Sequence, residues 1–72
     1  MRTIQFPLAG DHVALCDLLK LTGLAHSGGR AKALIAAGEV RVDGRVDTRK
    51  TAKIRAGQRV EFRDGRIEVL EN

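Results

Sequence analysis

The sequence holds few residues whose types and spacing could perform catalysis. Hydrolysis or group transfer needs a nucleophile, a base to activate it and an orienting group in one pocket. The single thiol, Cys16, stands between Leu15 and Leu18, a setting typical of a small, inert hydrophobe. His12 and His26 stand near predicted helix starts without an evident carboxylate partner, which favours capping or surface roles. We therefore expect a protein without enzyme activity.

Metal and cofactor chemistry finds as little support. One cysteine and two histidines are too few for a zinc knuckle or finger, and a lone cysteine cannot close an internal disulfide. Asp43, Asp47 and Asp64 lie in or beside predicted turns, where carboxylates accept hydrogen bonds from backbone N–H groups. We expect no metal and no other cofactor.

The segment Ser27-Gly28-Gly29-Arg30 at a predicted helix start could hold an anion. Free N–H groups, the helix dipole and small residues would let a phosphate approach, with Arg30 one turn into the helix. A second interpretation stays open, in which Ser27 only caps the helix and the two glycines permit the turn between helices. A nucleotide P-loop is excluded, because the sequence lacks its glycine and lysine spacing.

Positive charge is concentrated in one part of the chain. The 72 residues carry 13 Lys+Arg against 9 Asp+Glu, a formal net charge of +4. Residues 1–29 are neutral, whereas residues 30–66 hold eleven basic and five acidic side chains. This asymmetry indicates a polyanionic partner, either nucleic acid or an acidic membrane surface. Arg49, Lys50 and Lys53 fall in a polar segment with no apolar role, which favours nucleic acid over a merely solvated loop.

The two phenylalanines and the hydropathy pattern narrow the partner further. Phe6 and Phe62 both have the parity of core residues, so no aromatic platform could stack on bases, and contacts to the backbone of a structured RNA are favoured. Duplex DNA stays open as a variant of this hypothesis.

No apolar run approaches the roughly 18 residues of a membrane span, and Met1 to Gly10 lacks a signal-peptide pattern. We expect no membrane partner and a cytoplasmic location.

Periodicity and turn signals predict the elements that must position these side chains. A short edge strand covers residues 2–6 and stops at Pro7. A core helix of about ten residues runs from an Asp11 cap to Gly23, with Val13, Ala14 and Leu21 widening its apolar face. A second helix starts at Ser27, buries Ala31, Leu34 and Ile35, and ends at Gly38. Strands at 40–42, 45–46, 59–63 and 67–69 then follow, joined by an Asp43-Gly44 turn, an exposed basic loop at 47–53 and an Asp64-Gly65 turn.

The element order predicts the fold class. Strand, helix, helix and several short strands indicate an α+β unit in which two helices cover one face of a small twisted sheet. The short turns imply antiparallel pairing. A chain of this length has room for one domain and one core.

An ordered series of short motifs between Leu15 and Phe62 resembles the S-four RNA-binding domain, named for small-subunit ribosomal protein four. The motifs are Leu15-Cys16-Asp17-Leu18-Leu19-Lys20, Gly23, Ser27 to Ile35, Gly38-Glu39-Val40, Val42-Asp43-Gly44 and Ile54-Arg55-Ala56-Gly57. The resemblance implies two helices followed by a β-hairpin, and binding of structured RNA, often ribosomal or transfer RNA, through basic residues on the second helix and adjoining loops. The chain is similar to a short stand-alone bacterial member, without the catalytic domain that pseudouridine synthases or tyrosyl-tRNA synthetases attach.

Individual residues carry the resemblance and some depart from it. Ser27 matches the helix-start serine of the family, Arg30 and Lys32 match positions that are frequently basic, and Val42-Asp43-Gly44 matches a Val-Asn-Gly turn. Thr51 and Lys53-Ile54 stand where a serine and Lys-Val are usual. Gly28 replaces a common arginine, Lys50 replaces a proline, and Gln58 replaces an acid after Gly57. These departures would shift contacts toward Arg30 and the Arg49/Lys50 loop.

Together these inferences give one prediction of function. Residues 1–72 form a single, monomeric, non-catalytic RNA-binding domain with a core motif at about 12–62, which binds structured RNA, ribosomal or transfer RNA, through phosphate contacts. The residues expected to bind are Ser27, Arg30, Lys32, Arg49, Lys50, Lys53 and Arg55. The alternative is a ribosome-associated protein-interaction or assembly factor whose basic loop meets an acidic protein surface.

Overall fold

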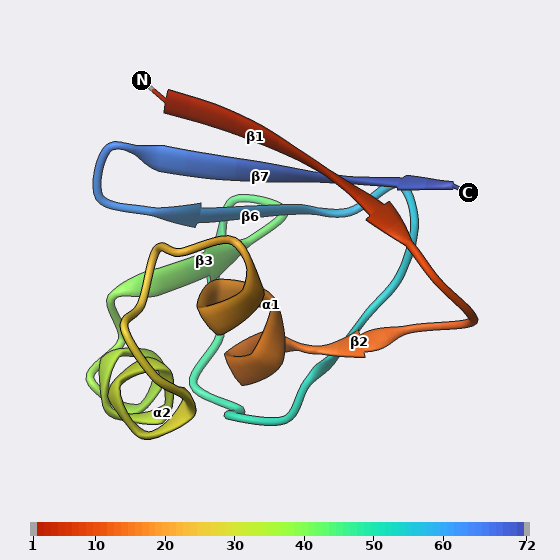
Figure 1. The fold of residues 1–72 in the computed structure, drawn as a ribbon. Helices are drawn as coiled ribbons and strands as arrows, with labels where there is room; N and C mark the ends of the chain where they lie inside the picture. Colours follow the sequence, from red (N-terminus) through yellow and green to blue (C-terminus); the bar gives the residue numbers. More distant parts are fainter. Residues whose placement is uncertain (1, 72) are drawn as a thin grey trace.

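A computed structural model of the chain describes residues 2–71, so the first and last residues of the predicted domain lie outside the described residues. The elements, in chain order, are β1 Arg2–Leu8, β2 Val13–Ala14, α1 Leu15–Leu21, α2 Gly28–Ala36, β3 Val40–Val42, β4 Arg45–Val46, β5 Lys53–Ile54, β6 Arg59–Phe62 and β7 Gly65–Glu71. Both helices lie on one side of the main sheet (Figure 1). This arrangement confirms the predicted α+β class.

The main sheet has five strands in the order β1-β7-β6-β3-β4, and β2 pairs separately with β5. The pairs β3/β4, β3/β6 and β6/β7 are antiparallel, as the short turns predict. β1 instead pairs with β7 in parallel, which makes the sheet mixed. No turn connects these two strands, because they come from opposite ends of the chain, so local turn signals say nothing about their direction.

β1 is an edge strand, as predicted, but it continues past Pro7 to Leu8. The Arg2 N–H donates to the Asp64 carbonyl oxygen at 2.7 Å. Because parallel ladders use alternate residues, Ile4, Phe6 and Leu8 have backbone groups directed toward β7, whereas the nitrogen of Pro7 is on the open side. A proline there removes no ladder hydrogen bond and blocks the edge to further strands. The strand therefore tolerates the proline that was expected to end it.

The start of α1 differs from the prediction. Asp11 does not cap the helix; the cap position is Ala14, which makes no side-chain cap hydrogen bond, and α1 has seven residues. Val13 and Ala14 form β2 and pair with β5. Distant backbone satisfies the helix start instead, because Leu15 N–H donates to the Ala52 carbonyl at 2.9 Å and Cys16 N–H to the Lys50 carbonyl at 3.1 Å. The first helix is thus tied directly to the basic loop.

α2 follows its sequence signals closely. The Ser27 hydroxyl oxygen accepts a hydrogen bond from the Arg30 N–H at 3.1 Å, and the helix ends at Ala36 before Gly38, whose φ is +78°. Gly28 and Gly29 are the first two residues of the helix and have no positive φ. They do not form the turn between helices, in contrast to one of the two interpretations above.

The core lies between the helices and the sheet. It contains Leu15, Leu18 and Leu19 of α1, the Ala31, Leu34 and Ile35 stripe of α2, and Val40, Val60, Phe62, Ile67 and Val69 of the sheet. Cys16 is buried, as expected of a small hydrophobe. Leu21 is 61% exposed, so the prediction that it widens the apolar face of α1 is wrong. It lies in the last turn, beyond Leu18 and outside the buried side of the helix.

Both predicted hairpins form, one of them with a shifted turn. Asp43 and Gly44 have φ of +52° and +84° between β3 and β4, as the two-residue turn requires. The second turn comprises Arg63 and Asp64, since Gly65 already pairs with Phe62. Arg63 takes the positive φ of +54°, and Gly65 has another role: a Cβ there would lie 2.8 Å from Leu24 Cδ2. Gly65 therefore leaves room for the segment that joins the helices.

Candidate nucleic-acid interface

Two cations lie on α2, where the capped helix start fixes the backbone. Arg30 and Lys32 are both exposed, and they flank the buried Ala31. The nine residues of α2 include no acid. Space above the helix start is open, since a Cβ on Gly28 would meet nothing within 4 Å and one on Gly29 only the Ser27 hydroxyl at 4.0 Å. This end of α2 is therefore uncovered and positively charged.

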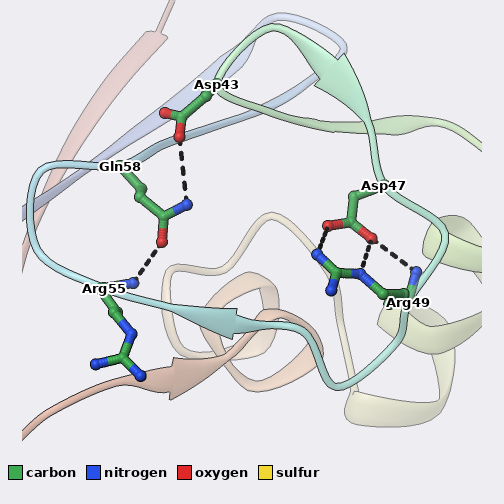
Figure 2. A network of polar contacts seen from close by, with 5 residues as sticks. All are labelled: Asp43, Asp47, Arg49, Arg55 and Gln58. Carbon is green, nitrogen blue, oxygen red and sulfur yellow. Dashed lines mark hydrogen bonds and ion pairs between the residues drawn. The ribbon is translucent and has the colours of Figure 1, made fainter.

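Residues 47–53, called the basic loop, run beside α2 and beneath the start of α1 (Figures 1 and 2). The two backbone hydrogen bonds to the start of α1 hold the loop in place. Ala52 is buried and Lys53 begins β5, so the loop has an apolar anchor, in contrast to the expectation of a segment with no apolar role. Arg49, Lys50 and Lys53 are exposed. Because the loop is anchored in this way, its three cations project from a fixed backbone.

Arg49 is held by an acid of the same loop. Asp47 Oδ1 accepts hydrogen bonds from the Arg49 backbone N–H at 2.9 Å and from Nε at 3.1 Å, and Oδ2 accepts from Nη2 at 2.8 Å (Figure 2). The side-chain hydrogen bonds from Arg49 lower the pKa of the Asp47 carboxyl, and the same contact raises the pKa of Arg49. The turn role predicted for Asp47 is confirmed, and the side-chain pair adds to it. An Asp-x-Arg spacing in a loop was the available signal for this pair.

Arg55 lies apart from these cations. Its Nη1 contacts both carboxylate oxygens of Asp11, at 3.1 and 3.2 Å, and the two residues line a shallow pocket together with Glu71. Figure 2 shows Arg55 and Arg49 on opposite sides of the view. The structure therefore brings Arg30, Lys32, Arg49, Lys50 and Lys53 to adjoining segments, but places Arg55 among acids.

A polar network fixes the turn next to the basic loop. Gln58 Oε1 accepts from the Arg55 N–H at 2.7 Å, Gln58 Nε2 donates to Asp43 Oδ2 at 3.2 Å, and Asp43 Oδ1 accepts from the Arg59 N–H at 2.9 Å. Asp43 and Gln58 line a groove that also includes Arg45 and Arg49. Arg45 is an exposed cation that the predicted site omits. Its place opposite Val42 in the hairpin is the signal that could have found it.

The residues with nucleophilic or acid–base chemistry are scattered. The Cys16 side chain is 4% exposed, and its sulfur has Asp17 Oδ1 as a contact at 3.9 Å. His12 Nδ1 lies 3.6 Å from Asp11 Oδ2 at the surface, and His26 is exposed. Residues 2–71 contain no group of three or more His, Cys, Asp or Glu that could hold a metal ion. No helix among them is long and apolar enough to span a membrane.

Comparison with known proteins gives the family. Residues 6–70 match the S4 domain. The chain belongs to the S4 domain family. This confirms the resemblance drawn from the motifs between Leu15 and Phe62. The family match also extends beyond them at both ends, so the S4 domain of this chain includes part of β1 and most of β7.

Relatives of this S4 domain occur in enteric bacteria. It is 56% identical over 59 residues to a protein of Escherichia coli named "Putative RNA-binding protein YbcJ", which covers 82% of this chain and 84% of that protein. YbcJ of Shigella flexneri matches with the same identity and coverage. The solution structure of Escherichia coli YbcJ, which reveals an ALFAL motif involved in RNA-binding, superposes with a TM-score of 0.68 at 50% identity over 97% of this chain and 87% of YbcJ. The S4 domain described here has the same fold.

Proposed function

We propose that this S4 domain is a non-catalytic module that binds structured RNA through phosphate contacts from one basic face. The observation that carries the proposal is the position of Arg30, Lys32, Lys50 and Lys53. All four are exposed on two adjoining segments, and none forms an ion pair within the described part of the chain. Cations that neutralise no acid of their own protein are available to phosphates. Arg49 adds a fifth cation from the same loop.

The class of partner follows from the relatives and from the missing stacking surface. Escherichia coli YbcJ is described as RNA-binding, and the resemblance to the S-four domain points to ribosomal or transfer RNA. Phe62 is buried and Phe6 packs against the core, so neither ring can stack on a base. Contacts to the sugar-phosphate backbone of a folded RNA remain, and such contacts recognise shape rather than base sequence. A protein that binds such an RNA would act as a single-domain monomer in the cytoplasm and would be associated with the ribosome.

The basic face can be tested by comparing two double variants that remove the same charge. Lys50→Ala/Lys53→Ala removes two cations of the basic loop, whereas Arg41→Ala/Arg59→Ala removes two exposed cations of β3 and β6. Fluorescence anisotropy with labelled, unfractionated bacterial transfer RNA gives the dissociation constant at several salt concentrations. Five phosphate contacts predict a slope of log affinity against log salt of about −3.5 to −4.5.

We expect the loop variant to weaken binding at least about tenfold and to reduce the salt slope by roughly 1.5, since it loses two contacts. The sheet variant should bind within about twofold of the wild type. Equal losses in both variants would show a response to net charge alone and would contradict the proposed face. An affinity independent of salt would contradict phosphate recognition.

Two further measurements separate RNA from the other partners. Unlabelled duplex DNA, added as competitor at matched salt, should displace the labelled RNA less well than unlabelled transfer RNA does. A pull-down from bacterial lysate should lose its protein partners after ribonuclease treatment. Partners that persist after digestion would favour the protein-interaction or assembly factor, whose basic loop meets an acidic protein surface.

A further inference from the structure

The Asp47–Arg49 ion pair joins a largely buried carboxylate to an exposed guanidinium. The Asp47 side chain is 13% exposed, whereas that of Arg49 is 78% exposed. Three hydrogen bonds connect them, two to Oδ1 and one to Oδ2. Figure 2 shows one edge of the guanidinium facing the carboxylate, with the remaining nitrogen directed away. The exposed arginine is therefore held at one edge by an acid that is itself fixed.

The pair leaves a complete binding edge on Arg49. A guanidinium has five N–H groups, and Asp47 takes the one on Nε and one on Nη2. Both N–H groups of Nη1 and the second of Nη2 stay free, and Nη1 and Nη2 together form the fork that fits two oxygens of a phosphate. A flexible arginine would lose side-chain freedom on binding. Here the intramolecular pair has already restricted it.

We infer that Asp47 is a positioning residue for RNA, which holds the guanidinium of Arg49 in the orientation that a phosphate requires. This inference rests on the proposed function. It has a counter-intuitive consequence, because Asp47 is an acid in a groove that Arg45 and Arg49 also line. General electrostatics predicts that removing an acid strengthens binding to a polyanion. A positioning role predicts that removing this acid weakens it.

The substitution Asp47→Asn separates positioning from loop structure. An asparagine keeps Oδ1, so it can still accept the hydrogen bond from the Arg49 backbone N–H that shapes the turn. Its Nδ2 donates instead of accepting, so it cannot receive the hydrogen bond from Nη2. Its Oδ1 can also keep the hydrogen bond from Nε, so the variant preserves the turn and loses the second of the two side-chain hydrogen bonds that orient the guanidinium.

Asp17→Asn is the matched control. Asp17 is an exposed acid in the first turn of α1, the turn whose Cys16 N–H donates to the Lys50 carbonyl. Asp17 forms no ion pair with another residue of the 2–71 segment. Both substitutions raise the net charge by one next to the basic loop, but only Asp47→Asn releases a cation from its partner.

The experiment measures binding of labelled, unfractionated transfer RNA by the wild type, by each single variant, and by Asp47→Asn in an Arg49→Ala background. We expect Asp47→Asn to weaken binding about three- to tenfold, and Asp17→Asn to leave it unchanged or slightly tighter. In the Arg49→Ala background, Asp47→Asn should cause no further loss. The Nη2–H resonance of Arg49 in the free protein, recorded at low temperature, should be resolved in the wild type and lost in Asp47→Asn, because only the wild type has an acceptor for it.

Three results would overturn the inference. Binding by Asp47→Asn that is as tight as binding by Asp17→Asn, or tighter, would show that Asp47 competes with phosphate or plays no part. A loss that persists in the Arg49→Ala background would show that Asp47 acts through the loop and not through Arg49. An unchanged Nη2–H resonance would show that Asp47 Oδ2 does not hold the guanidinium. A wild type that fails to bind transfer RNA contradicts the proposed function itself, before any variant is compared.

Discussion

At the scale of single residues, Asp43 and Gln58 are two departures from the S-four pattern that contact each other in the fold. In the S-four pattern an asparagine is usual at the first position and an acid at the second, and this chain has the reverse arrangement of charge. The structure joins the two side chains, with Gln58 Nε2 donating to Asp43 Oδ2 at 3.2 Å. An amide and a carboxylate are kept, but they have changed places. The departure at Gln58, which looks isolated in the sequence, is therefore compensated at Asp43.

This exchange predicts the outcome of a double-mutant cycle. Gln58→Glu places two carboxylates face to face and should lower the free energy of unfolding by about 1 kcal/mol. Adding Asp43→Asn restores a donor, because the new amide can donate to the new acid, and should recover most of the loss. Urea denaturation of the four proteins gives the coupling free energy. Additive effects would show that the two side chains do not interact in solution.

The lowered pKa of Asp47 predicts the direction in which the stability of the protein changes with pH. Hydrogen bonds from the Arg49 side chain lower the pKa of Asp47 in the folded state, so its contribution is present above the unfolded pKa of about 3.9. It is lost as the pH falls through the lower folded value. The difference in unfolding free energy between wild type and Asp47→Asn, measured by urea denaturation, should therefore shrink below about pH 4. A difference that grows on acidification would contradict the pair.

At the scale of elements, local signals decide what the sequence can predict. α2 is predictable because its cap, its buried stripe and its terminating Gly38 lie in one continuous segment. α1 is not, because the preference of Asp11 for a cap position competes with the pairing of Val13–Ala14 to Lys53–Ile54, which no local pattern encodes. The parallel pairing of β1 with β7 is unpredictable for the same reason, because the two strands come from opposite ends of the chain. The cations of the basic loop are recognisable in the sequence, whereas the partners of Arg49 and Arg55 depend on the fold.

The β6/β7 hairpin depends on Gly65 for packing rather than for its turn. A Cβ at this position would lie 2.8 and 3.2 Å from the two methyl carbons of Leu24. Leu24 is only partly buried and these carbons are the far end of its side chain, so Gly65→Ala should destabilise the protein by no more than about 1 kcal/mol through overpacking. Gly29→Ala, at an open helical position, should instead stabilise it by up to about 1 kcal/mol.

Thermal unfolding followed by circular dichroism compares these two glycine variants directly. Leu24→Ala is a control for Gly65→Ala, because it removes the methyl groups that the new Cβ would meet. Gly65→Ala should cost less in the Leu24→Ala background than in the wild type. An equal cost in both backgrounds would place the strain elsewhere, for instance at the Phe62 carbonyl, 3.4 Å from the same Cβ.

At the scale of the whole molecule, the two ends of the chain complete the core on which the two helices pack. Ile67 and Val69 of β7 and Leu8 of β1 are buried against the helices and the other strands. β7 lies between β1 and β6 in the sheet, so the strands outside the predicted core motif of about 12–62 form one side of the fold. The helix α2 and the basic loop, which carry the cations, thus depend on residues far from them in sequence.

The isolated segment 12–62 should therefore fail to fold. Burial of Leu8, Ile67 and Val69 contributes about 1.5 to 3 kcal/mol for each side chain, and a domain of this size has only about 3 to 5 kcal/mol of net stability. Removing all three costs about 4.5 to 9 kcal/mol, which matches or exceeds that margin, and it also exposes the edge of β6. We expect the segment to show no cooperative thermal transition and a collapsed range of amide chemical shifts, whereas residues 1–72 show both a transition and dispersed shifts. A cooperative transition in 12–62 would mean that α1, α2 and the β3/β4 hairpin form a self-sufficient core, with β1 and β7 as additions to it.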